Sequence, residues 1–73
     1  MDNTFSAYYP VIYTRIEAQK LLKIGKRSIL KKLQTGELAG YREHNREWRI
    51  PEISIQEYVE HKIHMSTLSQ HYR

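Results

Sequence analysis

Residues 14–36 read TRIEAQKLLKIGKRSILKKLQTG, which is two short segments of helical periodicity joined by a three-residue turn. Thr14 and Glu17, at the start, have the spacing of a capping box, in which each side chain accepts a hydrogen bond from a backbone N–H group of the first helical turn. The second segment begins near Lys26, and Gly36 follows it in the left-handed position that commonly ends a helix. The stretch therefore predicts two consecutive helices with a tight turn between them.

The turn and the second helix differ in character. The turn, residues 23–25, combines a buried-looking isoleucine with a glycine that tolerates unusual dihedrals. In the second helix, Lys26–Thr35, a rotation of about 100° per residue puts Ile29 and Leu33 on one side and the cationic residues on the other. The whole stretch contains seven basic side chains and one acidic side chain. We therefore expect the second helix to pack with one face and to present a cationic face outward.

Beyond the second helix, the apolar period changes from helical to strand-like. Trp48 and Ile50 alternate with charged residues, Tyr41 to Glu43 forms the facing strand, and residues 44–46 form a polar connection. Pro51 ends the second of these strands. The pattern predicts a short antiparallel β-hairpin.

A third amphipathic helix is predicted after the hairpin. Ile55, Tyr58 and Val59 recur at i, i+3 and i+4, and Ile63 continues the stripe. Combined with the earlier segments, the apolar pattern predicts a core of Ala18, Leu21, Ile24, Ile29, Leu33, Leu38, Trp48, Ile50, Ile55, Tyr58 and Val59.

The chain divides into an arm, one domain and a tail. Residues 1–12 show no sustained period and are expected to form an N-terminal arm, whose end, Val11–Tyr13, packs on the core as a short strand. Residues 13–63 form the domain, which is mainly α with a small β-hairpin. Residues 64–73 are polar and without a clear period, so a flexible C-terminal tail is expected.

Composition excludes several classes of protein. The chain of 73 residues suffices for one small domain, and because it has no cysteine it can form neither disulfides nor thiolate metal sites. No apolar run approaches the about 18 residues that a membrane span needs. The start of the chain lacks the basic region and apolar stretch of a secretory signal. We expect a cytoplasmic, nucleoid-associated protein that does not contact membranes.

The reactive side chains do not form a pattern typical of an enzyme. No nucleophile stands in a motif with a base and an orienting acid, and the sequence has no glycine-rich phosphate loop. His61 and His64 are three residues apart on the third helix and His71 lies in the tail, but a metal site needs three or four convergent ligands. We therefore predict no catalytic activity, no metal or other cofactor, and no small-molecule ligand.

Two helices around a tight turn, followed by a hairpin, have the order of a winged helix-turn-helix. The residues resemble, in order and spacing, those of the excisionase family, whose winged-helix DNA-binding domain is shared with the MerR-like regulators. The resemblance rests on Tyr13, Thr14, Glu17, Ala18, Leu21, Leu22, Ile24, Arg27, Ser28, Ile29, Gly36, Glu37, Leu38, Trp48, Arg49, Ile50, Pro51 and Tyr58. Three positions depart from the family pattern: Gly25 stands where Ser is usual, Ala39 where Pro is usual, and His44-Asn45 where a glycine is common.

The resemblance implies that the second helix and the hairpin, or wing, bind double-stranded DNA. On the helix, Arg27 and Lys31 lie one turn apart and match the two acceptors of guanine, while Ser28 can reach a phosphate or a base. Lys26 and Lys32 flank them and fit backbone phosphates. The wing residues expected to enter a minor groove are Arg42, His44, Asn45, Arg46 and Arg49. Which of these side chains contact bases is left open.

The resemblance further implies a recombination directionality factor. Neighbouring copies would bind adjacent sites, bend the attachment-site DNA and help a cognate integrase to excise a mobile element. The lack of a second domain favours this over a ligand-sensing MerR-type regulator, which needs a sensor and a long dimerisation helix. One alternative is a small phage or plasmid transcription regulator with the same domain. Another is a protein-interaction module whose basic helix binds an acidic partner.

Overall fold

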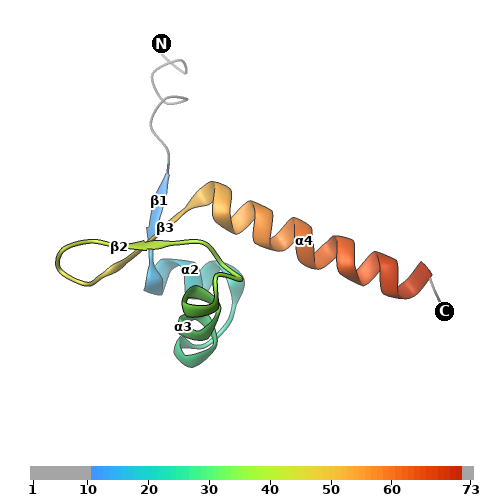
Figure 1. Ribbon diagram of the computed structural model, residues 1–73, viewed down its shortest axis with the longest axis horizontal. Helices are drawn as coiled ribbons and strands as arrows, with labels where there is room; N and C mark the ends of the chain where they lie inside the picture. Colours follow the sequence, from blue (N-terminus) through green and yellow to red (C-terminus); the bar gives the residue numbers. More distant parts are fainter. Residues whose placement is uncertain (1–10, 72–73) are drawn as a thin grey trace, which may run out of the picture.

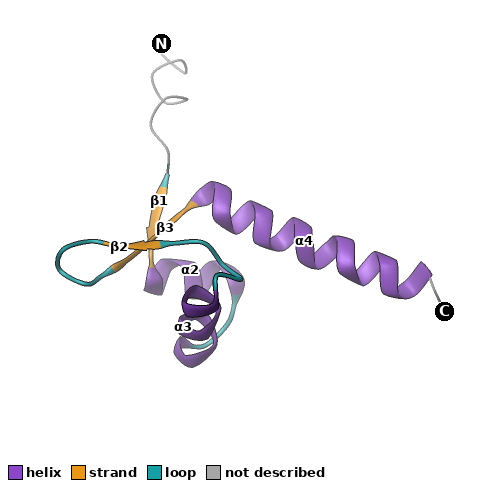
Figure 2. Cartoon of the chain, viewed as in Figure 1, coloured by secondary structure: helices purple, strands orange, loops and turns teal. Residues whose placement is uncertain are grey.

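The computed structural model describes residues 11–71, so the predicted N-terminal arm lies outside the described residues except for its last two positions. The described chain forms, in order, β1 (Ile12–Thr14), α2 (Arg15–Leu22), α3 (Lys26–Thr35), β2 (Tyr41–Arg42), β3 (Trp48–Pro51) and α4 (Glu52–His71), as drawn in Figure 1. Residues 11–71 thus contain three helices and a small sheet, coloured by type in Figure 2. This arrangement confirms the predicted winged helix-turn-helix.

β3 is the central strand of an antiparallel sheet with the strand order β1-β3-β2. β2 and β3 form the predicted hairpin, in which Arg42 pairs with Trp48. β1 pairs with the other edge of β3 and is the predicted N-terminal strand, displaced by one residue. Strand β2 is shorter than predicted, because Glu43 already belongs to the turn: its N–H donates to the carbonyl of Glu47 at 3.0 Å.

The predicted capping box and the tight turn are both present. The N–H of Thr14 donates to Glu17 Oε1 at 2.9 Å, and the N–H of Glu17 donates to Thr14 Oγ1 at 3.2 Å. The unusual dihedrals of the turn, however, fall on Lys23 (φ 58°), whereas Gly25 is extended (φ −86°). The left-handed residue is the one that caps the end of α2, and α3 needs an extended residue before it, so the tolerance of Gly25 for unusual dihedrals is not used.

The core lies where the helices meet the sheet and is smaller than predicted. The buried apolar side chains are Ala18, Ile29, Leu33, Leu38, Ile50 and Ile55, and Ile24, Trp48 and Tyr58 pack half-buried against them. Two predicted core residues are exposed: Leu21 at 52% and Val59 at 38%. On α2, the half-buried Leu22 packs inward instead of Leu21, because neighbouring helical residues point about 100° apart.

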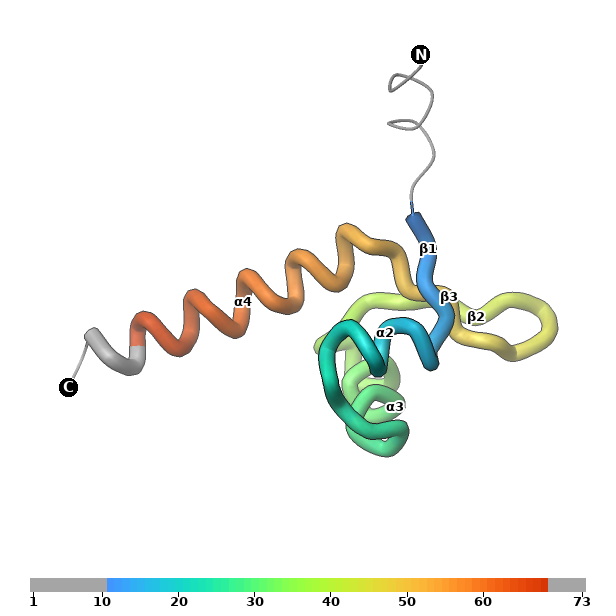
Figure 3. The backbone as a smooth tube through the Cα atoms, turned by 180° about the vertical axis from the view of Figure 1, so that it is seen from behind, coloured from blue at the N-terminus to red at the C-terminus, as the bar shows by residue number. Residues whose placement is uncertain are grey.

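α4 is longer than predicted and leaves the core. A flexible tail was predicted from residue 64, yet the helix continues to His71. Figure 3 shows this helix extending away from the helix pair, on the side opposite the hairpin. An α-helix satisfies its backbone internally, and the chain has no Gly or Pro after Pro51, so the helix continues without apolar contacts. None of the helices within residues 11–71 is long and apolar enough to cross a membrane.

Candidate nucleic-acid interface

The outward side of α3 is cationic, as predicted. A shallow surface on this side is lined by Lys26, Arg27, Leu30, Lys31 and Gln34, and we call it the outer face of α3. Ile29 and Leu33, on the opposite side of the helix, are buried in the core. Because the core holds the inner side of α3, its cationic side is turned to solvent in a defined orientation.

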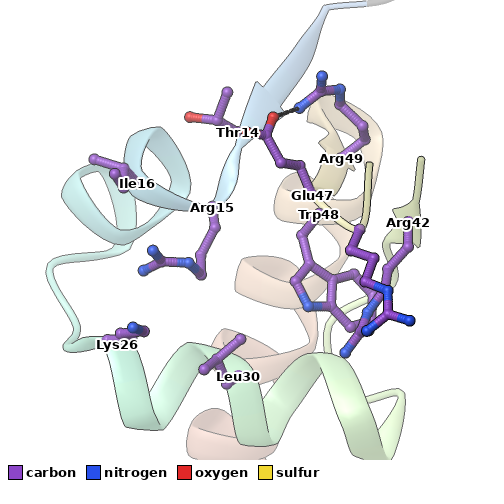
Figure 4. Close-up of a pocket in the computed structure, with 10 residues that line it drawn as sticks. Thr14, Arg15, Ile16, Lys26, Leu30, Arg42, Glu47, Trp48 and Arg49 are labelled. Carbon is purple, nitrogen blue, oxygen red and sulfur yellow. Dashed lines mark hydrogen bonds and ion pairs between the residues drawn. The ribbon is translucent and has the colours of Figure 1, made fainter. Parts of the chain in front are cut away.

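A groove separates α3 from the hairpin. It has a volume of about 490 Å³ and includes Thr14, Arg15, Ile16, Lys26, Leu30, Arg42, Arg46, Glu47, Trp48 and Arg49. Figure 4 shows Lys26 and Leu30 of α3 on one side of the groove and Arg42 and Trp48 of the hairpin on the other. Lys26 and Leu30 also belong to the outer face of α3, so the two surfaces form one continuous cationic region.

Arg42 is oriented by the only tryptophan of the chain. The two residues are cross-strand partners, and the Arg42 guanidinium carbon lies 5.0 Å from the centre of the Trp48 ring. A guanidinium over an aromatic face is held electrostatically while its N–H groups remain able to donate. Trp48, predicted as a core anchor, therefore packs against the core and also supports a cation in the groove.

The tip of the hairpin is held by local hydrogen bonds. Asn45 Oδ1 accepts from the N–H of Glu47 at 3.1 Å, and the N–H of Arg46 donates to the carbonyl of Glu43 at 2.8 Å. Arg46 takes a left-handed conformation (φ 67°). The Asn45 side chain thus stabilises the turn, while Arg46 reaches the groove and His44 is exposed outside the residues that line it.

Arg49, on the central strand, is paired with an acid. Its Nη1 lies 3.2 Å from Glu47 Oε1, and the two side chains are 27% and 63% exposed. Figure 4 shows this pair beside Thr14. Among the ion pairs within residues 11–71, Arg49 is thus the one predicted wing cation whose charge is balanced inside the hairpin.

Lys32 lies apart from the other predicted cations of α3. Its Nζ is 3.7 Å from Glu37 Oε2 and 5.4 Å from the centre of the Tyr58 ring. Lys62 of α4 binds the same two groups, at 2.9 Å and 5.5 Å. The hydrogen bond from Lys62, with the charge of Lys32, lowers the pKa of Glu37 below its ordinary value, and the hydrogen bond to Glu37 raises the pKa of Lys62. We call this group the Glu37 cluster.

The structure separates the ten predicted site residues into distinct places. Around the groove it gathers Lys26, Arg42, Arg46 and Arg49; on the outer face of α3 it adds Arg27 and Lys31; Ser28, His44 and Asn45 are exposed outside both surfaces, and Lys32 is in the Glu37 cluster.

Sequence reasoning missed Arg15 and Gln34. Arg15 begins α2 and reaches the groove because the preceding residue, Thr14, pairs with Arg49 in the sheet. Gln34 lies on the outer face one turn beyond Leu30. The signal for Gln34 was its helical spacing from Lys31 on the cationic side. Arg15 had no comparable signal, because the pairing of β1 with β3 joins distant parts of the sequence.

Comparison with known protein families identifies the domain. A family model described as a helix-turn-helix domain matches residues 12–63, which include the strands, α2, α3 and the first half of α4. No curated protein and no solved structure matches the chain. Since the matched region spans most of the sequence and contains both helices of the motif and the wing, the chain belongs to the helix-turn-helix domain family, a DNA-binding domain found in excisionase-like proteins.

Proposed function

We propose that this protein binds a specific double-stranded DNA site with α3 in the major groove and its hairpin against the neighbouring minor groove. The observation that supports this most is the continuous cationic region formed by the outer face of α3 and the groove. Arg27 and Lys31 make no ion pair with an acid anywhere in residues 11–71. Their N–H groups are therefore available to the guanine acceptors that a major-groove helix meets.

The groove cations fit a different task. Lys26 comes from α3, Arg42 from β2 and Arg46 from the hairpin turn, and all three line the groove together with the apolar side chains of Leu30 and Trp48. Such a cluster is suited to one strand of the sugar-phosphate backbone, which supplies affinity and orientation but no sequence information. With about 4–6 phosphate contacts, the logarithm of the affinity should fall with the logarithm of the salt concentration with a slope of about −4 to −5.

We further propose that the protein is an architectural excision factor. Single DNA-binding modules bury only about 600–1,000 Å² of protein surface, which gives limited specificity against a genome. Several copies on adjacent sites would add their affinities and bend the DNA, and a cognate integrase would use the bent site. The resemblance to excisionases and the occurrence of the matched domain in excisionase-like proteins support this role.

The DNA-binding proposal is tested by mobility shift with selected sites. We expect Arg27→Ala and Lys31→Ala to weaken specific binding by about 1–3 kcal/mol each and to relax the preference at one base. Lys20→Ala is the matched control, because Lys20 is an exposed cation of α2 outside both surfaces. Equal effects of all three substitutions would contradict the assignment of α3 as the recognition helix.

The architectural role is tested separately, with DNA fragments that carry one site or several. Cooperative binding, a bend in circular-permutation assays and stimulation of excision by the cognate integrase are expected. Independent binding to straight DNA would instead favour the small transcription regulator. If the protein binds no DNA but binds an acidic protein partner, the interaction module is favoured.

A further inference from the structure

One acidic side chain stands among the cations of the groove. Of the side chains that line it within residues 11–71, five are basic and Glu47 alone is acidic. Glu47 directly precedes β3 and stands two residues before Arg49, and its side chain reaches that of Arg49 on the same side of the hairpin. Their ion pair, at 3.2 Å, is drawn as a dashed line in Figure 4.

The backbone fixes this pair. The Glu47 N–H is bound by Asn45 Oδ1, and the Glu47 carbonyl accepts from the N–H of Glu43 at 3.0 Å. Arg49 lies on the central strand, opposite Thr14 on one side and Tyr41 on the other. Both partners therefore start from defined positions, and the carboxylate remains beside the guanidinium when the groove is empty.

The pair does little for folding. The Glu47 side chain is 63% exposed, and ion pairs at such sites contribute about 0–1 kcal/mol to stability because water and salt screen them. Its larger effect falls on anions that enter the groove. A phosphate that takes the Arg49 Nη1 donor has to displace Glu47, whose carboxylate would then stand unpaired beside a like charge.

We infer that Glu47 is a specificity-determining residue: it keeps Arg49 out of the non-specific DNA complex. This inference rests on the proposed function. Non-specific binding is almost wholly electrostatic, so each cation that is withheld lowers it. The closed pair leaves Arg27 and Lys31 of α3 untouched. Because Arg49 contributes little to binding of phosphates, base contacts supply a larger share of the total affinity than they would if all five groove cations bound phosphates.

The test uses a random-sequence duplex of about 20 base pairs and fluorescence titration, so no cognate site is needed. Glu47→Gln should bind this duplex about fivefold more tightly, which corresponds to about 1 kcal/mol between unit charges at contact distance in water. The salt slope should steepen by about 0.9, because Arg49 becomes available for one more phosphate. Glu43→Gln is the matched control: it removes the same charge from the same hairpin outside the groove, and it should change both quantities much less than Glu47→Gln does.

A double-mutant cycle shows whether Glu47 acts through Arg49. In an Arg49→Gln background, Glu47→Gln should no longer tighten binding. A gain that persists there, a gain with an unchanged salt slope, or an equal gain from Glu43→Gln would overturn the inference. The salt slope of Glu47→Gln alone decides the question if Arg49→Gln fails to fold. If the unmodified protein binds no duplex at all, the proposed function itself is wrong, which is a distinguishable result.

Discussion

Lys31 and Lys32 are neighbours in the sequence but lie in opposite environments. Lys31 is exposed on the outer face of α3, within the continuous cationic region. The Lys32 side chain is only 19% exposed and is held by Glu37 and the Tyr58 ring. Two identical residues thus divide between a surface suited to DNA and a contact between helices. The comparison teaches that charge along a helix predicts a binding face only after the packing of the other elements is known.

The continuous cationic region and the Glu37 cluster also differ in how their charges are balanced. On the groove side, five cations face one carboxylate. In the Glu37 cluster, two lysines share one carboxylate and one aromatic ring, and they connect α3, the following loop and α4. The first arrangement leaves positive charge for a partner, whereas the second uses it to join helices.

The largest expected effect comes from the core that holds both regions together. Leu33 is on the buried side of α3, so Leu33→Ala should cost about 2–5 kcal/mol of unfolding free energy, which is most of the stability of a small domain. Leu21→Ala is the matched control, because Leu21 is 52% exposed and should change stability by less than about 0.5 kcal/mol. Urea denaturation followed by circular dichroism measures both. Equal losses would show that the core extends to the outer side of α2.

The next effect separates the two lysines directly. Lys31→Ala should weaken binding to the specific site by about 1–3 kcal/mol if Lys31 contacts a base. Lys32→Ala should change that affinity much less, because Lys32 is directed toward Glu37 and Tyr58. The pair of variants therefore tests the prediction from sequence that Lys32 binds a phosphate. The measurement is a DNA titration of both variants, with melting curves to confirm that they fold. If Lys32→Ala loses as much affinity as Lys31→Ala, the two lysines do not differ in DNA binding.

A smaller effect concerns the start of the recognition helix. Gly25 is the N-cap of α3 and provides no side-chain hydrogen bond. Gly25→Ser should stabilise the fold by a few tenths of a kcal/mol (about 0.3), because a serine hydroxyl can accept from a free N–H of the first turn. A Cβ atom at this position would meet no atom within 4 Å. Gly36→Ser is the contrasting variant and should destabilise, since Gly36 has a φ of 86°. Thermal melts that rank the two variants in the reverse order would contradict the capping argument.

The smallest effect is in the pH dependence of stability. The pKa of Glu37 is held below its ordinary 4.5, first by the hydrogen bond from Lys62. Its contribution is therefore present above pH 4.5 and is lost as the pH falls through the lowered pKa in the folded protein. Glu37→Gln should flatten this acidic part of the stability curve and leave DNA binding unchanged. Glu57→Gln is the control, because Glu57 is on the same helix as Lys62 but outside the cluster. If Glu57→Gln flattens the stability curve equally, Glu37 is not the source of the acid dependence.

Local signals predicted the helix-turn-helix well. The start of α2 follows from Thr14 and Glu17, and the end of α3 follows from Gly36, because caps depend on residues within one helical turn. The predicted end of α4 was wrong, because it was placed where the apolar stripe is lost, whereas the helix continues to His71. A helix that projects from the core needs no such stripe.

The site was predicted only in part, because local spacing again carries the information for single helices but not for contacts between elements. The cations of α3 follow from helical spacing, since residues on one helix have known relative directions. The groove does not follow from spacing, because it forms only when β1 pairs with β3 and brings Arg15 close to the hairpin.

The sequence by itself determined the order of elements, the N-cap of α2, the C-cap of α3, the inner side of α3 and the excess of positive charge around it. These depend on interactions between residues a few positions apart, which the linear pattern records. Only the tertiary structure decided which cations are available: Lys32 contacts Glu37 and Tyr58, Arg49 is paired with Glu47, and Arg15 joins the groove. Charge is a property of the residue, but its availability depends on distances between elements, which are set when the helices pack on the sheet.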